Sequence, residues 1–477
     1  MPKKYDKILK SVLKKIKPSK EQEKKLKKIS SKVLRLVNST AKKYKAKAIL
    51  AGSLTRNTWL PDKNEFDVFL LFPEKMKKKR LEELGLKIGR VVIRKLKGSY
   101  KVEYAEHPYV SGKIGDVSVD IVPCYALEST EKLKSAVDRT PFHVKYLEKH
   151  LPLRLSSDVR LLKQFLEANE MYGADAKVEG YSGYLCELLV INYRSFINVL
   201  KAATKWNPGE IIDMENVYPR SDYGKLRKKF WNEPLIFLDP VDPNRNVAAA
   251  LSSKNFFKFK KLAKEFLSTP KEDFFFPKEY KPLTEDELIR FQISRRTELL
   301  IIKFIPPKVV PDILWPQLRR FAERLKSILE EKKYEFRVLG KDVYTDGKFF
   351  AVVLLEMEVS KLPMIQKRIG PLVFDKIDSE RFIKKYKEQA LVGPYVEGNH
   401  WVVEVKRDFL TAREKIIDSL SKPLDILLAK GIPKYIAERI ANGFDVFSEN
   451  EQIMHMIKRN PEFGIFLRRY FEKEKLV

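Results

Sequence analysis

Cysteine and histidine are scarce in this chain, which excludes several kinds of site. The 477 residues contain only two cysteines and five histidines. Both cysteines, Cys124 and Cys186, lie among apolar residues, so we expect buried free thiols in a reducing compartment rather than a disulfide or a zinc site. The histidines are scattered and show no metal-ligand spacing. We therefore predict a cytoplasmic protein without a disulfide framework.

Long apolar runs are also missing. No run approaches the roughly twenty residues that a membrane-spanning helix needs. The lysine-rich start of the chain lacks the apolar segment of a signal peptide. We therefore expect neither a membrane span nor a membrane partner.

Acidic residues are outnumbered by basic ones. The chain has 94 lysines and arginines against 64 aspartates and glutamates, which leaves a formal charge of +30. This excess predicts a polyanionic partner, and nucleic acid is the first candidate, although a ribosome-associated or membrane-surface protein would carry the same charge. A chain of this length is too long for one core, so we expect three or four domains.

Two carboxylates stand two residues apart at the start of an apolar run. Glu65 precedes and Asp67 lies within the run 66–72, which ends at Pro73 and is typical of a buried strand. Residues i and i+2 of a strand point to one face, so both carboxylates project side by side. Burial strengthens their mutual repulsion, and a cation between them relieves it. Mg²⁺, which prefers oxygen ligands, is the natural candidate.

A third carboxylate follows about fifty residues later. The segment 115–123 alternates polar and apolar residues, and Asp116, Ser118 and Asp120 share its polar face. Asp120 lies deeper in the predicted strand, whereas Asp116 follows Gly115 and is expected to open the strand from a turn. We therefore choose Asp120 as the functional member. Three carboxylates on adjacent strands can hold two metal ions on the order of 4 Å apart, the spacing used for in-line phosphoryl transfer.

A Gly-Ser pair precedes these carboxylates. The segment 47–51 is typical of a short strand and 54–58 of the first turn of a helix, with Gly52 and Ser53 between them. A glycine lets the backbone approach a ligand closely, and the N–H groups at a helix start can bind phosphate. Ser53 adds a hydroxyl and Arg56 a guanidinium. Alone, the pair is equally well a turn between strand and helix; together with the carboxylates it predicts a phosphate-binding site.

In combination, Gly52-Ser53, Glu65-x-Asp67 and Asp120 resemble the signature of the polymerase-beta-like nucleotidyltransferase superfamily. Within that superfamily, the sequence resembles the archaeal, class I tRNA CCA-adding enzymes. The likeness continues in one order through the segments 139–143, 159–163, 180–187, 242–248, 367–371 and 393–398. These segments span most of the chain, so the resemblance goes well beyond the catalytic motif.

The resemblance implies a role for each site residue. Glu65, Asp67 and Asp120 would be the catalytic residues and would hold two Mg²⁺ ions. The nucleotide-binding residues that it implies are Gly52, Ser53, Arg56, Thr140, His143, Lys163, Tyr172 and Arg245.

Physical arguments from the residues support some of these roles more than others. Arg160 and Lys163 share one face of a predicted helix, and a cation on the face that meets the head domain would lie near the phosphates. Arg245 offers a planar fork of donors that suits the acceptor edge of a base. Without the resemblance, Lys163 reads as a surface lysine, Tyr172 as packing, His143 as structural and Arg245 as a charge at a helix start.

By the same resemblance, the protein is expected to be a CCA tRNA nucleotidyltransferase. Such an enzyme adds and repairs the 3′-terminal CCA of tRNA without a template, using CTP and ATP and releasing pyrophosphate. Its partners would be the 3′ acceptor end and the elbow of tRNA; the oligomeric state, a homodimer included, stays open. The alternatives are a poly(A) polymerase or another non-templated RNA nucleotidyltransferase, and a non-catalytic RNA-binding protein on the same scaffold. The presence of all three carboxylates argues against the last.

The expected fold is α+β and multidomain. The resemblance implies a polymerase-beta-like head with a mixed sheet, a helical neck that binds nucleotide, a ferredoxin- or RRM-like α+β body that binds RNA, and a tail that binds tRNA. The expected ranges are 1–152 for the head, 153–282 for the neck, 283–330 and 406–477 for the body, and 331–405 for the tail.

Capping signals and hydrophobic periodicity predict the main elements. Ser19 and Gln22 have capping-box spacing and an apolar stripe follows from Leu26, so we expect a helix that packs on the catalytic sheet. The other predicted elements are helices at 184–200, 247–267, 311–329 and 378–387, strands at 298–304 and 400–405, a hairpin of 334–344 with 348–359, and a rigid loop at 239–243.

Overall fold

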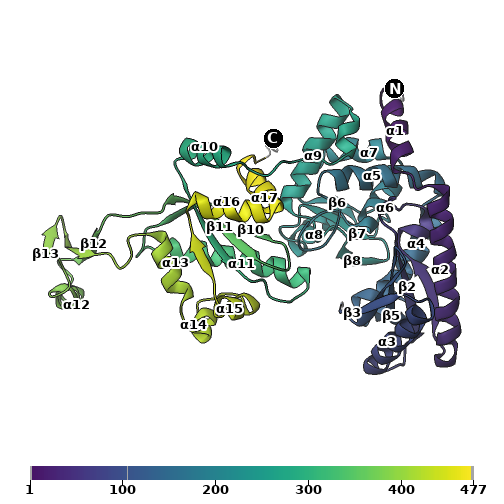
Figure 1. Ribbon diagram of the computed structural model, residues 1–477, viewed down its shortest axis with the longest axis horizontal. Helices are drawn as coiled ribbons and strands as arrows, with labels where there is room; N and C mark the ends of the chain where they lie inside the picture. Colours follow the sequence, from purple (N-terminus) through teal and green to yellow (C-terminus); the bar gives the residue numbers. More distant parts are fainter. Residues whose placement is uncertain (1–2, 105, 474–477) are drawn as a thin grey trace. The chain divides into compact units, whose positions relative to one another are not determined.

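A computed structural model describes residues 3–104 and 106–473 and divides into two compact units (Figure 1). The first unit runs to Lys278 and the second begins at Glu279. Each unit contains both helices and strands, which confirms the predicted multidomain α+β class. In the described part of the chain, no helix is long and apolar enough to cross a membrane.

The first unit contains a five-stranded mixed sheet with the order β1-β2-β5-β4-β3. Strand β2 runs parallel to β5, and the other neighbours are antiparallel. The strands are β1 (Lys47–Ala51), β2 (Glu65–Pro73), β3 (Ser99–Tyr104), β4 (Pro108–Ile114) and β5 (Val117–Ala126). The strands predicted for 47–51 and 66–72 are thereby confirmed.

Helices make up most of the rest of this unit. They are α1 (Lys3–Ile16), α2 (Lys20–Ala41), α3 (Lys78–Lys95), α4 (Thr140–His150), α5 (Ser156–Ala168), α6 (Gly183–Tyr193), α7 (Phe196–Ala203), α8 (Tyr223–Lys229) and α9 (Ser253–Ser268). Short 3-10 helices are η1 (Lys42–Tyr44), η2 (Ser53–Arg56), η3 (Thr130–Lys132), η4 (Ala136–Arg139), η5 (Leu153–Leu155), η6 (Arg220–Asp222) and η7 (Glu272–Phe275). A small sheet has the order β6 (Glu210–Ile212), β7 (Leu235–Asp239) and β8 (Asp242–Asn246).

The capping box predicted at Ser19 is present. The Ser19 hydroxyl accepts a hydrogen bond from the Gln22 N–H at 3.1 Å, and the Gln22 side chain accepts one from the Ser19 N–H at 2.9 Å. Buried residues of α2, such as Leu26 and Val33, join the core of the sheet. The helix therefore packs on the five-stranded sheet, as predicted.

The two faces of β2 have different partners. Its even-numbered apolar residues pack with α2 and α3 in one core. Phe69 packs on the opposite face with Val144 of α4. Because side chains alternate along a strand, Glu65 and Asp67 lie on the same face as Phe69. The carboxylates therefore point away from the α2–α3 layer.

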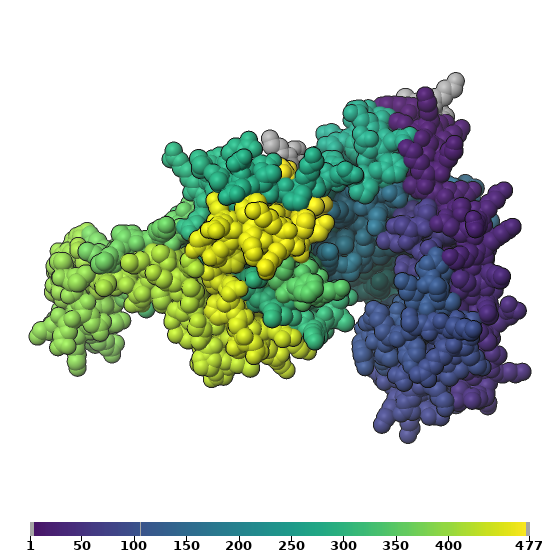
Figure 2. Space-filling model, in the orientation of Figure 1, coloured from purple at the N-terminus to yellow at the C-terminus, as the bar shows by residue number. Residues whose placement is uncertain are grey.

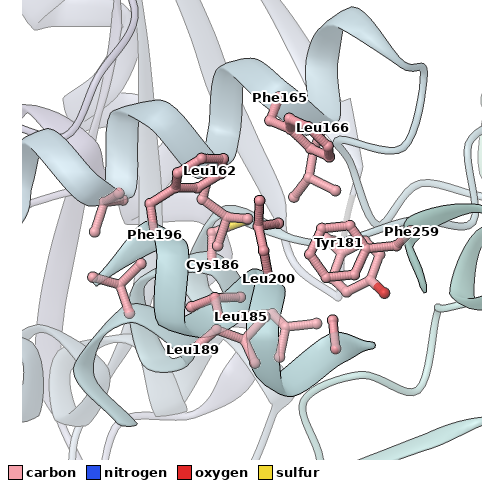
Figure 3. Packing of buried hydrophobic residues seen from close by; sticks show 14 of the residues in the cluster. Leu162, Phe165, Leu166, Tyr181, Leu185, Cys186, Leu189, Phe196, Leu200 and Phe259 are labelled. Carbon is pink, nitrogen blue, oxygen red and sulfur yellow. The ribbon is translucent and has the colours of Figure 1, made fainter. Parts of the chain in front are cut away.

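A second core of the first unit is formed by helices α5, α6, α7 and α9. Figure 3 shows Phe165 of α5, Cys186 of α6 and Phe259 of α9 within one cluster of apolar side chains. Phe165 lies among five other phenylalanine rings at centroid distances of 5.6–6.2 Å. Both Cys124 and Cys186 are buried and free, which confirms the prediction from their apolar surroundings.

The helix predicted for 184–200 is wrong as a single element. Arg194 has a positive φ of 67° and ends α6 after Tyr193, and Ser195 then caps α7 through the N–H of Asn198. The change of direction brings the apolar side chains of both helices into the same core.

Two predictions for 239–267 also need correction. The segment 239–243 is not a rigid loop but the turn of the β7–β8 hairpin, in which Asp239 pairs with Asp242. The helix predicted from residue 247 begins at Ser253, because the Ser252 hydroxyl caps it.

The second unit is built on a four-stranded antiparallel sheet with the order β10-β11-β9-β15. Its strands are β9 (Glu298–Phe304), β10 (Arg337–Thr345), β11 (Ala351–Val359) and β15 (Asp445–Phe447). Its helices are α10 (Glu285–Arg295), α11 (Pro311–Leu329), α13 (Ala412–Leu420), α14 (Leu424–Ala429), α15 (Lys434–Ile440), α16 (Asn450–Arg459) and α17 (Pro461–Phe471). The predicted strand 298–304, helix 311–329 and hairpin about 345–347 are confirmed.

A separate three-stranded sheet lies within the second unit. Its order is β12 (Ile365–Leu372), β14 (His400–Lys406) and β13 (Val392–Glu397), and α12 (Lys376–Tyr386) packs on it. Figure 2 shows these residues, in light green, as a narrow lobe of the unit. Strands β10 and β11, which fall within the range 331–405 expected for the tail, pair with β9 in the four-stranded sheet.

Replacing Phe165 with alanine should destabilise the first unit by about 3–5 kcal/mol, since the ring is fully buried and leaves a cavity. Hydrogen exchange of α5 and α6 in increasing urea measures this loss of unfolding free energy. Leu153→Ala, in the same unit but 75% exposed, should change it by less than about 0.5 kcal/mol. Equal effects of the two substitutions would contradict this description of the core.

Candidate functional site

A cavity of about 390 Å³ opens on the face of the mixed sheet that carries the carboxylates. It lies wholly within the first unit. It is lined by Ala51, Gly52, Ser53, Arg56, Glu65, Phe66, Asp67, Phe69, Ser118, Val119, Asp120, Thr140, His143, Val144, Leu147, Lys163, Tyr172, Gly183, Tyr184 and Glu187. Ten of the eleven residues predicted from the sequence therefore line one cavity, and Arg245 is the exception.

The parallel pairing of β2 with β5 brings the carboxylates together. Asp67 is the register partner of Asp120, and Glu65 is the partner of Ser118. Asp116 is exposed in the turn before β5 and forms an ion pair with Lys25 at 2.6 Å. Between the two aspartates considered for the third position, Asp120 is the one that lines the cavity.

Burial and like charge act together on Asp67. Burial, followed by the charges of Asp120 and Glu65, raises the pKa of Asp67 to about 7, although Arg56 opposes the rise. Burial is also the main cause that raises the pKa of Asp120, while a hydrogen bond from Ser111 lowers it. The pair therefore carries negative charge that the protein only partly compensates.

The donor chemistry of this pair fits a divalent metal ion. Asp67 and Asp120 lie opposite each other on two neighbouring strands, with Glu65 on the same side. Their carboxylate oxygens are the hard donors that Mg²⁺ prefers. A cation would also relieve the repulsion that raises the pKa of Asp67. Over residues 3–104 and 106–473, however, no three His, Cys, Asp or Glu side chains are gathered closely enough to hold a metal ion as they stand. The donor set fits, whereas a closed ligand cage is not formed.

Gly52 brings the backbone close to Asp67. Its φ is +85°, in the region that favours glycine, and an added Cβ would lie 3.2 Å from Asp67 Oδ2. The helix predicted after it is only the four-residue 3-10 helix η2, which ends where Asn57 adopts a positive φ of 56°. Such a short element does not offer the free N–H groups of a helix start, so that argument for phosphate binding does not hold. The groups that could still bind phosphate here are the Ser53 hydroxyl and the Arg56 guanidinium.

A buried carboxylate that the sequence analysis missed holds two of the predicted cations. Glu187, 1% exposed, accepts hydrogen bonds from Arg56 Nε at 3.0 Å and from Lys163 Nζ at 3.4 Å. The Thr58 hydroxyl donates to the same carboxylate at 2.6 Å. Burial opposes ionisation, but Lys163, Arg56 and Thr58 together lower the pKa of Glu187. A signal existed in the sequence, since an acidic residue within the apolar run 185–191 requires a buried partner.

Lys163 and Tyr172 lie next to each other at the cavity wall. A Cβ added to Gly183 would lie 3.0 Å from the Tyr172 hydroxyl, so glycine leaves room for that group, and the same Cβ would lie 3.8 Å from Lys163 Nζ, an ordinary contact. Arg160, predicted to share the helix face of Lys163, is instead buried and donates to the Trp59 carbonyl at 3.0 Å. Arg160 therefore supports the segment after η2 and does not line the cavity.

Two of the remaining predicted residues, His143 and Arg245, are connected by a second buried carboxylate, Asp239. It accepts hydrogen bonds from His143 Nε2 and from Arg245 Nη1, each at 2.9 Å. The ring of Tyr184 stacks on that of His143 with their centroids 4.0 Å apart. Arg245 lies in strand β8, not at the helix start of the alternative interpretation, and Asp239 joins it to the cavity wall. Thr140 lines the cavity as the first residue of α4.

Three family models match consecutive parts of this chain. A nucleotidyltransferase domain matches residues 20–143. The second domain of tRNA nucleotidyltransferase matches residues 157–276. The C-terminal domain of CCA-adding enzyme matches residues 295–449.

Several curated proteins are similar over nearly the full length. A CCA-adding enzyme of Methanocaldococcus jannaschii is 40% identical over 94% of this chain and 97% of its own length. One of Methanosarcina acetivorans is 37% identical over 96% of this chain and 97% of its own. One of Archaeoglobus fulgidus is 36% identical over 93% of this chain and 95% of its own.

The raised pKa of Asp67 predicts a pH-dependent stability of the metal-free protein. Folding favours protonated Asp67, so its stabilising contribution is present below the ordinary pKa of 3.8 and is lost as the pH rises through about 7. In EDTA, the unfolding free energy of the first unit should fall less between pH 4 and pH 8 in Asp67→Asn than in wild type. The difference should reach a few kcal/mol, because one pKa unit corresponds to about 1.4 kcal/mol. In Asp116→Asn, the unfolding free energy should fall as much as in wild type. If it also fell as much as in wild type in Asp67→Asn, the raised pKa of Asp67 would be contradicted.

Removing the charge of Glu187 should destabilise the first unit by about 3–5 kcal/mol, because Arg56 and Lys163 stay buried without their counter-charge. Urea unfolding of Glu187→Gln checks this. Inorganic tripolyphosphate should stabilise Glu187→Gln more than wild type, since an added anion replaces the lost charge.

Glu167→Gln is the matched control for Glu187→Gln. Its partner Lys63 lies 3.2 Å away, but both side chains are about one-third exposed, so the loss should stay below about 1 kcal/mol. If tripolyphosphate stabilised wild type, Glu187→Gln and Glu167→Gln equally, the cations paired with Glu187 would not be the ones that bind the anion.

Proposed function

This chain belongs to the family of CCA-adding enzymes, and we propose that it adds and restores the 3′-terminal CCA of tRNA without a template, using CTP and ATP and releasing pyrophosphate. The observation that carries the proposal is similarity to such enzymes over more than nine-tenths of the chain, with the predicted catalytic carboxylates at one cavity. The reaction joins an RNA 3′-hydroxyl to the α-phosphate of a nucleoside triphosphate.

The catalytic role falls to Glu65, Asp67 and Asp120. Nucleotidyltransferases of this superfamily generally use divalent metal ions. Two Mg²⁺ ions, when bound by these carboxylates, would lower the pKa of the attacking hydroxyl and neutralise charge on the pyrophosphate. The raised pKa of Asp67 supports this assignment, because the pair needs a cation to ionise fully at neutral pH.

The triphosphate is assigned to another group of residues that line the same cavity. Ser53, Arg56, Lys163 and Tyr172 line it, and two of them are cations whose side chains are at most 9% exposed. In a site with little water, such cations interact strongly with phosphate. Glu187 holds both in place before the nucleotide arrives, which reduces the reorganisation needed on binding.

The nucleoside is assigned to Thr140, His143 and Arg245. Thr140 and His143 line the cavity, and the Arg245 guanidinium offers the donors that a base edge can accept. The tRNA itself, at its acceptor end and elbow, is assigned to the second unit, which includes the match to the C-terminal domain of CCA-adding enzyme. The charge of +30 supports the binding of an RNA backbone.

Incorporation into tRNA that lacks its 3′ end tests the function. CTP alone should add two residues, ATP alone none, and both together three residues before addition stops. Continued addition of ATP would instead identify a poly(A) polymerase. Failure of every nucleotide to be incorporated, with folded protein and Mg²⁺ present, would contradict an enzymatic role.

Asp120→Ala should reduce incorporation at least about a thousandfold, because a ligand of the metal beside the attacking hydroxyl is lost. Asp116→Ala is its matched control, since Asp116 is an aspartate of the same segment but is exposed in the turn before β5 and paired with Lys25. It should retain wild-type incorporation within about threefold. Activity retained by Asp120→Ala, or lost equally in both variants, would overturn the assignment of Asp120.

A further inference from the structure

We propose that Asp239 is a positioning residue that fixes the Arg245 guanidinium and the His143 imidazole for the incoming base, and thereby sets which nucleotides are accepted. The inference rests on the proposed function, because it assigns Arg245 and His143 to the nucleoside. Asp239 itself does not line the cavity.

Asp239 is placed to hold several elements at once. Its side chain is 0% exposed. Oδ2 accepts from His143 of α4 and Arg245 of β8, each at 2.9 Å. Oδ1 accepts from the Tyr184 hydroxyl of α6 at 3.3 Å and from the Val241 N–H at 3.1 Å. One carboxylate therefore joins two helices to the β7–β8 hairpin.

The carboxylate also determines what its partners can offer to a ligand. Burial alone would raise the pKa of Asp239, but the His143 hydrogen bond and charge, the Val241 N–H and the Arg245 charge lower it. An ionised carboxylate only accepts hydrogen bonds, so Nε2 of His143 must carry a proton. The imidazole is therefore held with Nδ1 as its other polar atom, in a fixed ring orientation.

Arg245 gains a defined direction from the same contact. An arginine has five N–H donors in a rigid fork, and the hydrogen bond from Nη1 to Asp239 restricts the positions that the other donors can take. The Arg245 side chain is 37% exposed, so part of the fork remains accessible to solvent or ligand. Without Asp239, the long side chain would sample several rotamers, and its donors would no longer be held in one direction.

His143 and Tyr184 extend this arrangement to the cavity wall. Their rings stack with an interplanar angle of 26°, and both line the cavity. Asp239, which does not itself line the cavity, accepts a hydrogen bond from each of the two residues. A base that packs against this wall would contact the rings of His143 and Tyr184 and the Arg245 guanidinium, and the Asp239 carboxylate holds all three groups in position.

A neighbouring aspartate provides a matched comparison. Asp242 is the register partner of Asp239 on the same hairpin and also binds an arginine, Arg139, at 2.7 Å. Neither Asp242 nor Arg139 lines the cavity. Substitution of Asp242 therefore disturbs the hairpin and an arginine pair without touching Arg245 or His143.

The test uses the full chain with CTP, ATP and UTP and tRNA lacking its 3′ end. Asp239→Asn keeps the size of the side chain and one acceptor but removes its charge. We expect KM for CTP and ATP to rise at least tenfold and the preference over UTP to fall at least tenfold, while kcat changes less than threefold. Asp242→Asn should leave all three values within threefold of wild type.

A double-mutant cycle separates positioning from a merely structural role. If Asp239 acts through Arg245, Asp239→Asn should have less than a threefold further effect on selectivity in an Arg245→Ala background. If Asp239→Asn loses thermal stability, Asp239→Glu, which keeps the charge but moves the carboxylate, should show the same KM and selectivity changes. Additive effects, or equal effects of Asp239→Asn and Asp242→Asn, would overturn the inference.

Binding of CTP without tRNA distinguishes this inference from the proposed function. Calorimetry in Ca²⁺ should show at least tenfold weaker CTP binding in Asp239→Asn than in wild type. If wild type transfers no nucleotide to tRNA but binding still weakens in this way, the proposed function fails and the positioning role stands. If transfer is normal and CTP binding by Asp239→Asn equals wild type, the positioning role fails alone.

Discussion

Parallel pairing of β2 with β5 sets Asp67 directly opposite Asp120, and the chemistry of the cavity depends on this pairing. Two carboxylates on adjacent strands repel each other, and burial raises the pKa of Asp67 to about 7. Apolar packing on both faces of β2 keeps the strand in register in spite of this cost. Stability of the sheet thus maintains an arrangement of charge that a divalent cation would relieve.

Two further buried carboxylates hold basic side chains in position. Glu187 holds Arg56 and Lys163, and Asp239 holds His143 and Arg245. Each carboxylate is almost inaccessible to solvent, so water screens its interactions with its partners only weakly. The cations are therefore fixed by the protein itself, and an anionic ligand meets groups that need little rearrangement.

Local patterns predicted individual helices and strands well. Strand β9, helix α11 and the capping box of α2 follow from periodicity and capping alone. Errors occurred where tertiary contacts or single backbone angles decide the outcome, as at Arg194, whose positive φ separates α6 from α7. The predicted helix after Gly52 is reduced to η2 because Asn57 also has a positive φ, which no residue pattern indicated.

The sequence by itself determined which chemical groups are available: a pair of carboxylates at strand spacing, a third in an alternating segment, a Gly-Ser turn and a large excess of positive charge. These are properties of spacing along one chain segment, which periodicity reveals. Only the tertiary structure decided which buried acid meets which cation, as in the contacts of Glu187 with Arg56 and of Asp239 with Arg245. Arg56 and Glu187 lie 131 positions apart in the sequence. Asp239 and Arg245 lie on the two strands of a hairpin whose turn the sequence predicted as a loop. Such contacts depend on how elements pack, and packing is a property of the whole fold rather than of any segment.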